Sequence, residues 1–433
     1  MHFLSLSHSS RYLVALSGGA DSVALLLCML RGGYEIEAAH CNFQLRGEES
    51  ERDERFVREL CEQRGVRLHT VRFNTRAAAA ERHESIEMAA RRLRYEWFDA
   101  LRRERKLDFV AVAHHRDDNI ETFLLNLLRG AGIHGLTGMR SERGGVVRPL
   151  LETTRAEILQ FLESEGQPFV TDSTNADTLF RRNKIRHELL PLLRTINPSA
   201  DATIAETVRR LSDAERLLDY AVSALADQVM RRCGDVLKID LAALQRTPAP
   251  NLLLFELLSP YGFNGTEVDE ILSARAGGCW QTAAHLATRT GTAVEVAPMP
   301  QPVPETALPF EGCLSLPGGR VLRVERLPRE RLGNIPRDPN IAVLDADALD
   351  TYIYIRSVRT GDRFSPFGMR GTQLVSDYLT NRRRSRIDKL RALAVCDERG
   401  ILWLAGERPD NRAAVKPETK NIVKLVLSCV ENP

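Results

Sequence analysis

The sequence "YLVALSGGADSVALLLCML", from Tyr12 to Leu30, decides the fold of the first part of the chain. It opens with an apolar run that is typical of a buried strand and ends at Leu16. After Asp21 the sequence is apolar again, over a length that predicts a helix to about Leu30. The small and polar residues between the two elements raise the question of what a turn of this composition binds.

Glycines in a strand-to-helix turn let the backbone approach a ligand, and the free N–H groups of a helix's first turn attract an anion. The alternative is an ordinary tight turn in which Asp21 or Ser22 caps the helix. Average residue frequencies give five such specified residues less than about once in a thousand chains of this length. The sequence therefore favours a phosphate site, formed by Ser17, Gly18, Gly19, Ala20, Asp21 and Ser22.

Strand and helix patterns alternate through the first two hundred residues. Apolar, β-rich runs occur at 12–16, 34–40, 66–73 and 107–113, and a helical pattern follows each of them. This alternation predicts an α/β domain with a parallel sheet that helices cover on both faces. Ligands bind at the carboxyl ends of such strands, so the polar segments 17–22, 40–46 and 114–118 should lie together.

Length and composition limit the class of protein. The chain has 433 residues, enough for two or three domains, and a net charge of only +2. Affinity for nucleic acid must therefore come from local clusters of arginine. Eight cysteines without a CxxC pair predict buried thiols in a reducing compartment, and no segment resembles a leader or a membrane span. These features predict a cytoplasmic protein that does not act in a membrane.

Changes of pattern along the chain predict four segments. Residues 1–198 form the α/β domain, and the long helical pattern after Thr195 predicts a mostly helical middle domain over 199–296. The Pro-rich stretch 297–309 opens a linker and connecting segment that extends to 351. A small α+β domain over 352–433 follows, with a run of arginines near its start.

The turn at Ser17 resembles the PP-loop of the N-type ATP pyrophosphatases. No lysine follows its glycines, so the GxxxxGK[ST] pattern of kinases and GTPases is absent. The resemblance implies that the loop binds the pyrophosphate end of ATP while AMP is transferred. It also implies that Asp21 helps to hold Mg²⁺, a cation that prefers oxygen ligands.

A second motif, "AHHRDDNIETFLLNLLRG" from Ala113, follows the fourth predicted strand. Asp118 and Glu121 are three residues apart on one helical face, where they either bracket a cation or simply open a solvated helix. The segment resembles the HxxDDxxET signature of the tRNA(Ile)-lysidine synthases, to which we assign His115, Asp117, Asp118, Glu121 and Thr122. Segments from His40, Glu87 and Arg181 resemble the same family. Gln44 stands where relatives commonly carry a second histidine.

The resemblance implies a ligase that acts in two steps on tRNA(Ile) with the anticodon CAU. ATP adenylates the wobble cytosine with release of pyrophosphate, and free L-lysine then attacks carbon 2 and expels AMP, leaving lysidine. The modified tRNA reads AUA instead of AUG and carries isoleucine instead of methionine. Asp118 and Glu121 are then expected to bind lysine, and His115 to handle a proton of the attacking amine or to serve as a structural histidine.

Arginine-rich stretches provide the expected contacts with the substrates, although a charge run can also be only a solvated face. Positive clusters favour binding of the tRNA backbone. The resemblance leaves the oligomeric state open between a monomer and a homodimer. The expected substrate ligands are Arg92, Arg181, Arg182, Arg186, Arg382, Arg383, Arg384 and Arg386.

Three other functions compete with this interpretation. A tRNA thiolase of the same class normally needs paired reactive cysteines, and no CxxC pair is present. An amide-forming ligase for small molecules explains the first domain but does not explain the C-terminal arginines. An RNA-binding protein without enzyme activity explains the arginines but not the intact loop from Ser17 to Ser22.

Overall fold

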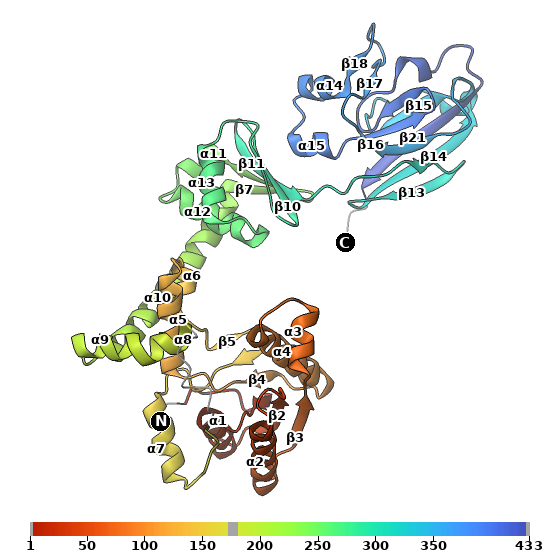
Figure 1. Ribbon diagram of the computed structural model, residues 1–433. Helices are drawn as coiled ribbons and strands as arrows, with labels where there is room; N and C mark the ends of the chain where they lie inside the picture. The colour runs from red at the N-terminus through yellow and green to blue at the C-terminus, as the bar shows by residue number, and fades with distance from the viewer. Residues whose placement is uncertain (1–2, 172–180, 430–433) are drawn as a thin grey trace. The chain divides into compact units, whose positions relative to one another are not determined.

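The computed structural model describes residues 3–171 and 181–429, without the side chains of Arg181 and Cys429. The chain forms two compact units, Met1–Asp219 and Tyr220–Pro433, and the boundary falls within helix α10 (Ala200–Val229). Figure 1 shows the course of the chain and the element labels.

The first unit contains a six-stranded sheet in the order β3-β2-β1-β4-β6-β5. Five strands are parallel to one another, namely β3, β2, β1, β4 and β6. The sixth, β5, forms an antiparallel hairpin with β6. The predicted parallel sheet is thus confirmed, and the short β5–β6 hairpin is an addition to it. The strands are β1 (Arg11–Ala15), β2 (Glu35–Asn42), β3 (Leu68–Arg72), β4 (Phe109–Ala111), β5 (Glu142–Arg143) and β6 (Val146–Val147).

Helices follow the strands as the sequence pattern predicts, with a few further short ones. A π-helix, η2 (Ile185–Leu189), lies between α8 and α9. The α-helices of this unit before α10 are α1 (Ala20–Arg31), α2 (Glu48–Arg64), α3 (Thr75–Glu81), α4 (Ile86–Glu104), α5 (Arg116–Leu128), α6 (Ile133–Leu136), α7 (Arg155–Ser164), α8 (Arg181–Lys184) and α9 (Leu190–Ile196).

Alternate residues of β1 belong to two separate cores, one on each face of the sheet. Tyr12 and Val14 are in a cluster with apolar residues of α1, α2 and α7. Leu13 is in a second cluster with Phe98 and Leu101 of α4. Helices therefore cover both faces, and a strand buried on both sides explains the continuous apolar run at the start of the chain.

The second unit begins with the rest of α10 and a mixed α/β region. Three helices, α11 (Leu241–Gln245), α12 (Pro250–Leu258) and α13 (Gly265–Ser273), accompany an antiparallel sheet in the order β7-β8-β11-β10-β9. The helical character was expected from the sequence, whereas the five-stranded sheet was not. Its strands are β7 (Met230–Cys233), β8 (Val236–Asp240), β9 (Cys279–Gln281), β10 (His285–Arg289) and β11 (Ala293–Pro298).

The C-terminal part of this unit consists of two four-stranded sheets and two short helices, α14 (Val375–Asn381) and α15 (Arg386–Leu390). The sheets have the orders β12-β16-β19-β20 and β13-β14-β21-β15, and both contribute to one core that includes the fully buried Trp403. The strands are β12 (Thr306–Ala307), β13 (Gly312–Leu316), β14 (Arg320–Pro328), β15 (Ile341–Asp345), β16 (Tyr354–Ser357), β19 (Leu393–Asp397), β20 (Gly400–Leu404) and β21 (Asn421–Cys429). A separate pair, β17 (Arg363–Phe364) and β18 (Gln373–Leu374), completes the strands.

Strands β13, β14 and β15 lie within the segment 297–351, which the sequence analysis expects to be a connection. All three belong to the same sheet as β21, near the C-terminus. The C-terminal fold therefore draws on residues of this segment. The four-part division of the chain stays a prediction.

Contacts join the two halves of the second unit. Arg391, just after α15, donates two hydrogen bonds of 2.7 and 2.8 Å to the carboxylate of Asp235 between β7 and β8. Ile387 of α15 packs with Leu286 and Ala297 of the five-stranded sheet. The pairing of apolar burial with a bidentate ion pair fixes the orientation of α15 against that sheet.

Two composition-based expectations can be compared with the structure. Cys233, Cys279 and Cys313 are exposed, so the expectation that the thiols are buried is wrong for these three. The strands and turns that carry them belong to the parts of the second unit that the sequence pattern did not resolve. Within residues 3–171 and 181–429, no helix has the length and apolar character needed to cross a membrane.

Candidate active site

The turn between β1 and α1 has an unusual backbone conformation, which its small residues allow. Gly18 has φ +93°, and a Cβ atom there would lie 3.3 Å from Cγ2 of Val57. The hydroxyl of Ser22, which is 5% exposed, accepts hydrogen bonds of 3.2 Å from the N–H groups of Ser17 and Gly18 and donates one of 2.9 Å to the carbonyl of Gly19. Ser22 therefore holds the loop together from within.

Among the residues that the structure describes, no side chain caps the N-terminus of α1. Gly19 is the N-cap residue and has extended backbone angles, and neither Asp21 nor Ser22 accepts a bond from a first-turn N–H group as a cap. The open N-terminus, with its positive helix dipole, points to a site for an anion. The geometry thus agrees with the phosphate interpretation and not with an ordinary capped turn.

A cavity of about 400 Å³ opens beside this loop. It lies among the carboxyl ends of β1, β2 and β4 and the side chains of α4, as expected for a parallel sheet. The guanidinium of Arg91 lies over the ring of Tyr95, and that of Arg94 over the ring of Phe43. The lining includes Leu16, Ser17, Gly19, Asp21, Ser22, Cys41, Phe43, Arg91, Arg94, Tyr95, Phe98 and His114.

A second cavity of about 390 Å³ adjoins the first. The two share Ser17, Cys41, Phe43 and Arg94 in their walls. The second is further lined by charged side chains, among them Arg46, Asp53 and Glu87. Together the cavities give the loop enough adjoining space for more than one small molecule.

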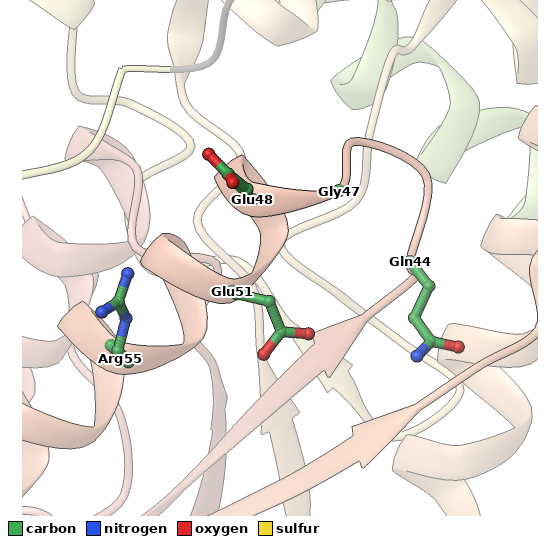
Figure 2. A pocket seen from close by; sticks show the side chains of 5 residues that line it. All are labelled: Gln44, Gly47, Glu48, Glu51 and Arg55. Carbon is green, nitrogen blue, oxygen red and sulfur yellow. The ribbon is translucent and has the colours of Figure 1, made fainter.

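Another pocket, of about 650 Å³, lies at the start of α2 (Figure 2). Figure 2 shows that Glu48, Glu51 and Arg55 extend from α2, whereas Gln44 comes from the loop after β2. Its lining includes no residue of the loop from Ser17 to Ser22. This pocket is therefore separate from the loop.

Asp21, expected to bind Mg²⁺, contacts an arginine that the sequence analysis did not select. The guanidinium of Arg155, the first residue of α7, donates a short hydrogen bond to the carboxylate of Asp21. The backbone N–H of Arg155 also donates to Asp117 at 2.8 Å. The start of α7 is thus linked both to the PP-loop and to the start of α5.

The two histidines before α5 have different positions, and the assignment of His115 to the signature is off by one. His114 stands three residues before Asp117, as HxxDD requires, and lines the first cavity. His115 is 4% exposed and is the N-cap of α5, where its Nδ1 accepts from the N–H of Asp118. Its Nε2 lies 3.8 Å from Asp21 and 3.5 Å from Asp118. His115 is thus the N-cap of α5, and its part in proton transfer stays a prediction.

The environment of His114 favours a neutral imidazole. Burial lowers the pKa of His114 to about 4, and the nearby guanidinium groups of Arg148, Arg182 and Arg91 act in the same direction against the opposing charge of Asp118. Its Nδ1 is buried and has no hydrogen-bond partner among the residues that the structure describes. A neutral imidazole in the wall of a cavity is a suitable hydrogen-bond partner for a polar group of a substrate.

Asp118 and Glu121 form one cluster with Arg182 and Arg186. Arg182 donates 2.9 Å and 2.7 Å bonds to Asp118 and Glu121, and Arg186 donates 2.6 and 3.1 Å bonds to the two oxygens of Glu121. The structure thus unites residues expected to bind lysine with residues expected to bind tRNA. Arg186 belongs to the π-helix η2, and π-helical turns are frequent at functional sites.

The two carboxylates of this cluster differ in accessibility. The side chain of Glu121 is 1% exposed and that of Asp118 is 15% exposed. Burial by itself raises the pKa of Asp118, but the electrostatic interactions with His115, Arg182 and His114 outweigh it, and the net result is a lowered pKa. Asp118 is thus anionic and reachable, whereas Glu121 is enclosed by its arginines.

The other expected substrate ligands have varied surroundings. Arg92 pairs with Glu84 and Glu96, and its neighbours Arg91 and Arg94 line the first cavity instead. The side chain of Arg181 lies outside the described part of the chain, so its role stays a prediction. In the second unit Arg384 and Arg382 contact the buried Glu407, while Arg383 and Arg386 are exposed.

Comparison with known proteins gives the class and then the family. A family model described as "PP-loop domain" matches residues 1–193, and one described as "TilS substrate binding domain" matches residues 232–289. With the loop and sheet described above, the first match defines an ATP-using protein of the PP-loop class.

Curated relatives cover nearly the whole chain. The tRNA(Ile)-lysidine synthase of Bacteroides thetaiotaomicron is 43% identical over 95% of this chain and 94% of its own length. That of Parabacteroides distasonis is 41% identical over 96% and 95%. The chain belongs to the tRNA(Ile)-lysidine synthase family, which are ATP-dependent ligases.

Solved structures show more distant likenesses. A U34-tRNA thiolase from Methanococcus maripaludis is 18% identical over 48% of this chain and 73% of its own, with a TM-score of 0.41. A solved C-terminal domain titled TILS is 22% identical over 30% of this chain and 100% of its own, with a TM-score of 0.27. These TM-scores are low, and the family assignment rests on the curated relatives.

Proposed function

We propose that the first unit ligates free L-lysine to the wobble cytosine of tRNA(Ile) in the two cavities beside the Ser17–Ser22 loop. In the first step the O2 oxygen of cytosine attacks the α-phosphate of ATP and pyrophosphate leaves. In the second step the ε-amine of lysine attacks carbon 2, loses a proton, and AMP leaves with the oxygen. The uncapped N-terminus of α1, which faces the cavity, is the observation that carries this proposal.

Binding of ATP is assigned to the loop and the cavity around it. The open N–H groups at the start of α1 bind the pyrophosphate end, as the geometry of Gly18 and Ser22 permits. Arg91 and Arg94 of α4 line the same cavity and provide positive charge there. Arg92, which the sequence analysis selected, pairs with Glu84 and Glu96, and its role as a substrate ligand stays a prediction.

Mg²⁺ is assigned to Asp21, and the residues present fit a metal that ATP brings with it. Asp21 and Asp118 both approach His115 Nε2, so two carboxylates converge near the loop. Phosphate oxygens of ATP and water would complete the coordination of the ion. The ion would neutralise charge on the leaving pyrophosphate.

The amine is assigned to Asp118 and His114. Asp118 is the more accessible carboxylate of the cluster and accepts the lysine ammonium, which exchanges with part of the arginine contacts. His114, whose lowered pKa makes it a weak base, lines the same cavity and orients the amine as a neutral hydrogen-bond partner, and the proton that the amine loses passes to water. Glu121 is a positioning residue in this scheme, because its oxygens are held by Arg182 and Arg186.

Contacts with the tRNA outside the wobble base are assigned in part to the second unit. Arg383 and Arg386 are exposed and have no ion-pair partner among the described residues, which suits binding of phosphates. Recognition there would explain how tRNA(Met), which shares the CAU anticodon, is avoided. Arg382 and Arg384 are proposed to support this surface through Glu407.

Reconstitution tests the proposal. The full chain with ATP, Mg²⁺, lysine and an unmodified tRNA(Ile) is expected to release AMP and to add the mass of lysine minus water to the tRNA. Omission of lysine or of tRNA, or replacement by tRNA(Met), should abolish AMP release. Release of AMP that depends on ammonia or on a sulfur donor instead of lysine would contradict the proposal in favour of an amide-forming ligase or a thiolase.

A further inference from the structure

The contact between Asp21 and Arg155 points to a role for α7 in nucleotide binding. Nothing in the sequence motifs assigns a function to Arg155. It is the first residue of α7, whose N-terminus is fixed by a capping box between Thr154 and Glu157. Its backbone N–H is bonded to Asp117, so the start of the helix has a defined position against α5.

The carboxylate of Asp21 requires a neighbouring cation, and the guanidinium of Arg155 lies in that position. It donates a short hydrogen bond to the Asp21 carboxylate, in the first turn of α1. The side chains of Arg155 and Asp21 are 41% and 30% exposed, so the pair lies at an accessible surface of the loop. In the described structure the guanidinium has no other hydrogen-bond partner, and a single exposed ion pair is weak enough to exchange.

The chemistry of the bound state requires a rearrangement of this pair. A divalent ion that arrives with ATP competes with the guanidinium for the Asp21 oxygens. The displaced guanidinium then lies beside the open N-terminus of α1, next to the pyrophosphate. Its planar array of donors fits two phosphate oxygens at once.

We propose that Arg155 is the resident counter-ion of Asp21 in the nucleotide-free loop and becomes a ligand of the pyrophosphate half of ATP when Mg²⁺ takes Asp21. This inference rests on the proposed function, because it presumes that ATP binds at the loop. It adds a ligand from α7, an element outside both sequence motifs, to the binding site.

A purely structural ion pair between α1 and α7 is the competing explanation, and the chain contains a control for it. Arg31, the last residue of α1, pairs at 2.6 Å with Glu165, the C-cap residue of α7. The two pairs join the same two helices, but only the first lies at the loop. R31M and R155M therefore remove equivalent links at opposite ends of one packing interface.

Calorimetric titration of the full chain with ATP tests the proposal, without tRNA or lysine so that no turnover occurs. Wild type, R155M, R155K and R31M are titrated at saturating Mg²⁺ and over a range of lower Mg²⁺ concentrations. At saturating Mg²⁺ we expect R155M to bind ATP about 10- to 100-fold more weakly than wild type, R155K to lie between them, and R31M to match wild type. The Mg²⁺ concentration that gives half-maximal ATP binding should fall in R155M, because the competing cation is gone.

Three outcomes would overturn the proposal. ATP affinity in R155M equal to that of wild type would show that the guanidinium does not reach the phosphates. An equal loss in R31M and R155M would show a structural link only, and an unchanged Mg²⁺ requirement in R155M would exclude exchange at Asp21. Failure of the wild type itself to bind ATP would contradict the proposed function, and is distinguishable because it precedes any comparison of variants.

Discussion

At the scale of single residues, the two adjacent histidines show how position decides chemistry. His114 and His115 have the same side chain, but one lines the cavity and the other caps α5. Burial lowers the pKa of His114 to about 4, from an ordinary value of 6.5. A histidine that the fold keeps neutral binds no proton at neutral pH, and it also makes the fold sensitive to acid.

The lowered pKa of His114 predicts a specific loss of stability in acid. Below pH 6.5 the imidazole takes up a proton in the unfolded chain but not in the folded one until about pH 4, so the free energy of unfolding falls over this range. H114Q removes the group and should lose less stability than wild type between neutral pH and about pH 4.5 in urea titrations. H8Q, at an exposed histidine of the same unit, is the matched control. Parallel pH profiles of H114Q and wild type would contradict the assignment.

The two carboxylates of the arginine cluster should respond differently to substitution. D118N removes the accessible charge and should raise the lysine concentration for half-maximal rate about 10- to 100-fold, since a charge-assisted contact is worth about 1.5–3 kcal/mol. Adenylation of tRNA without lysine should persist in D118N. E121Q loosens Arg182 and Arg186 and should weaken adenylation itself. An unchanged lysine dependence in D118N would show that the amine binds elsewhere, for which the second cavity is the next candidate.

At the scale of secondary-structure elements, the β1–α1 turn combines two requirements. The backbone of Gly18 is in the left-handed region, and the Ser22 hydroxyl occupies the inside of the turn so that first-turn N–H groups remain open. A side chain at Gly18 is strained by its φ of +93° and is close to Val57. A side chain at this position would therefore distort the open first turn of α1, which we propose to bind the phosphates.

G18A should weaken ATP binding more than it weakens the fold. The left-handed conformation costs a non-glycine residue about 1–2 kcal/mol, and the loop can relieve this strain by shifting. G166A is the matched control, because Gly166 follows α7 with φ +61° and a Cβ atom added there would meet no other atom within 4 Å. Both variants should lower the melting temperature, but only G18A should raise the Kd for ATP in a titration. A loss of ATP affinity in G166A as large as in G18A would contradict the local explanation.

The sequence patterns predicted the elements around this turn well and other elements poorly. The alternation of apolar runs predicted β1 to β4 and the helices that follow them, because both faces of those strands are buried. The two-residue strands β5 and β6 and the five-stranded sheet of the second unit carry too little periodicity to be distinguished from loops. In the site, the loop was predictable from local sequence. The contacts of Arg155 with Asp21 and of Arg186 with Glu121 depend on tertiary packing, and no local pattern signals them.

At the scale of the whole molecule, the two units divide the proposed tasks. The first holds the loop, both cavities and the arginine cluster, and the second holds the exposed arginines between α14 and α15. Truncation before Tyr352 is a poor test of the second unit, because it removes β21 and leaves β14 paired on one edge only. Point variants on the surface avoid this damage.

R383Q/R386Q should weaken tRNA binding without affecting ATP. Each lost phosphate contact lowers the slope of log K against log salt by close to one unit, so the double variant should lose up to about two units. R331Q/R337Q, which neutralises two exposed arginines elsewhere in the same unit, should keep the wild-type slope. Filter binding of tRNA(Ile) over a range of salt concentrations gives both values. Equal slopes in the two double variants would show that the α14–α15 arginines are only a solvated surface.

The place of β21 in its sheet has a consequence for biosynthesis. β21 lies between β14 and β15, and its ladder pairs Val321 with Ser428, which are 107 residues apart. During synthesis, the edge of β14 that pairs with β21 therefore stays unpaired until β21 has been made. An unpaired edge strand favours association between neighbouring nascent chains. The edge strand β14 carries positive charges at Arg320, Arg323 and Arg326. Repulsion between these charges on neighbouring nascent chains would keep the chains apart until β21 has paired with β14.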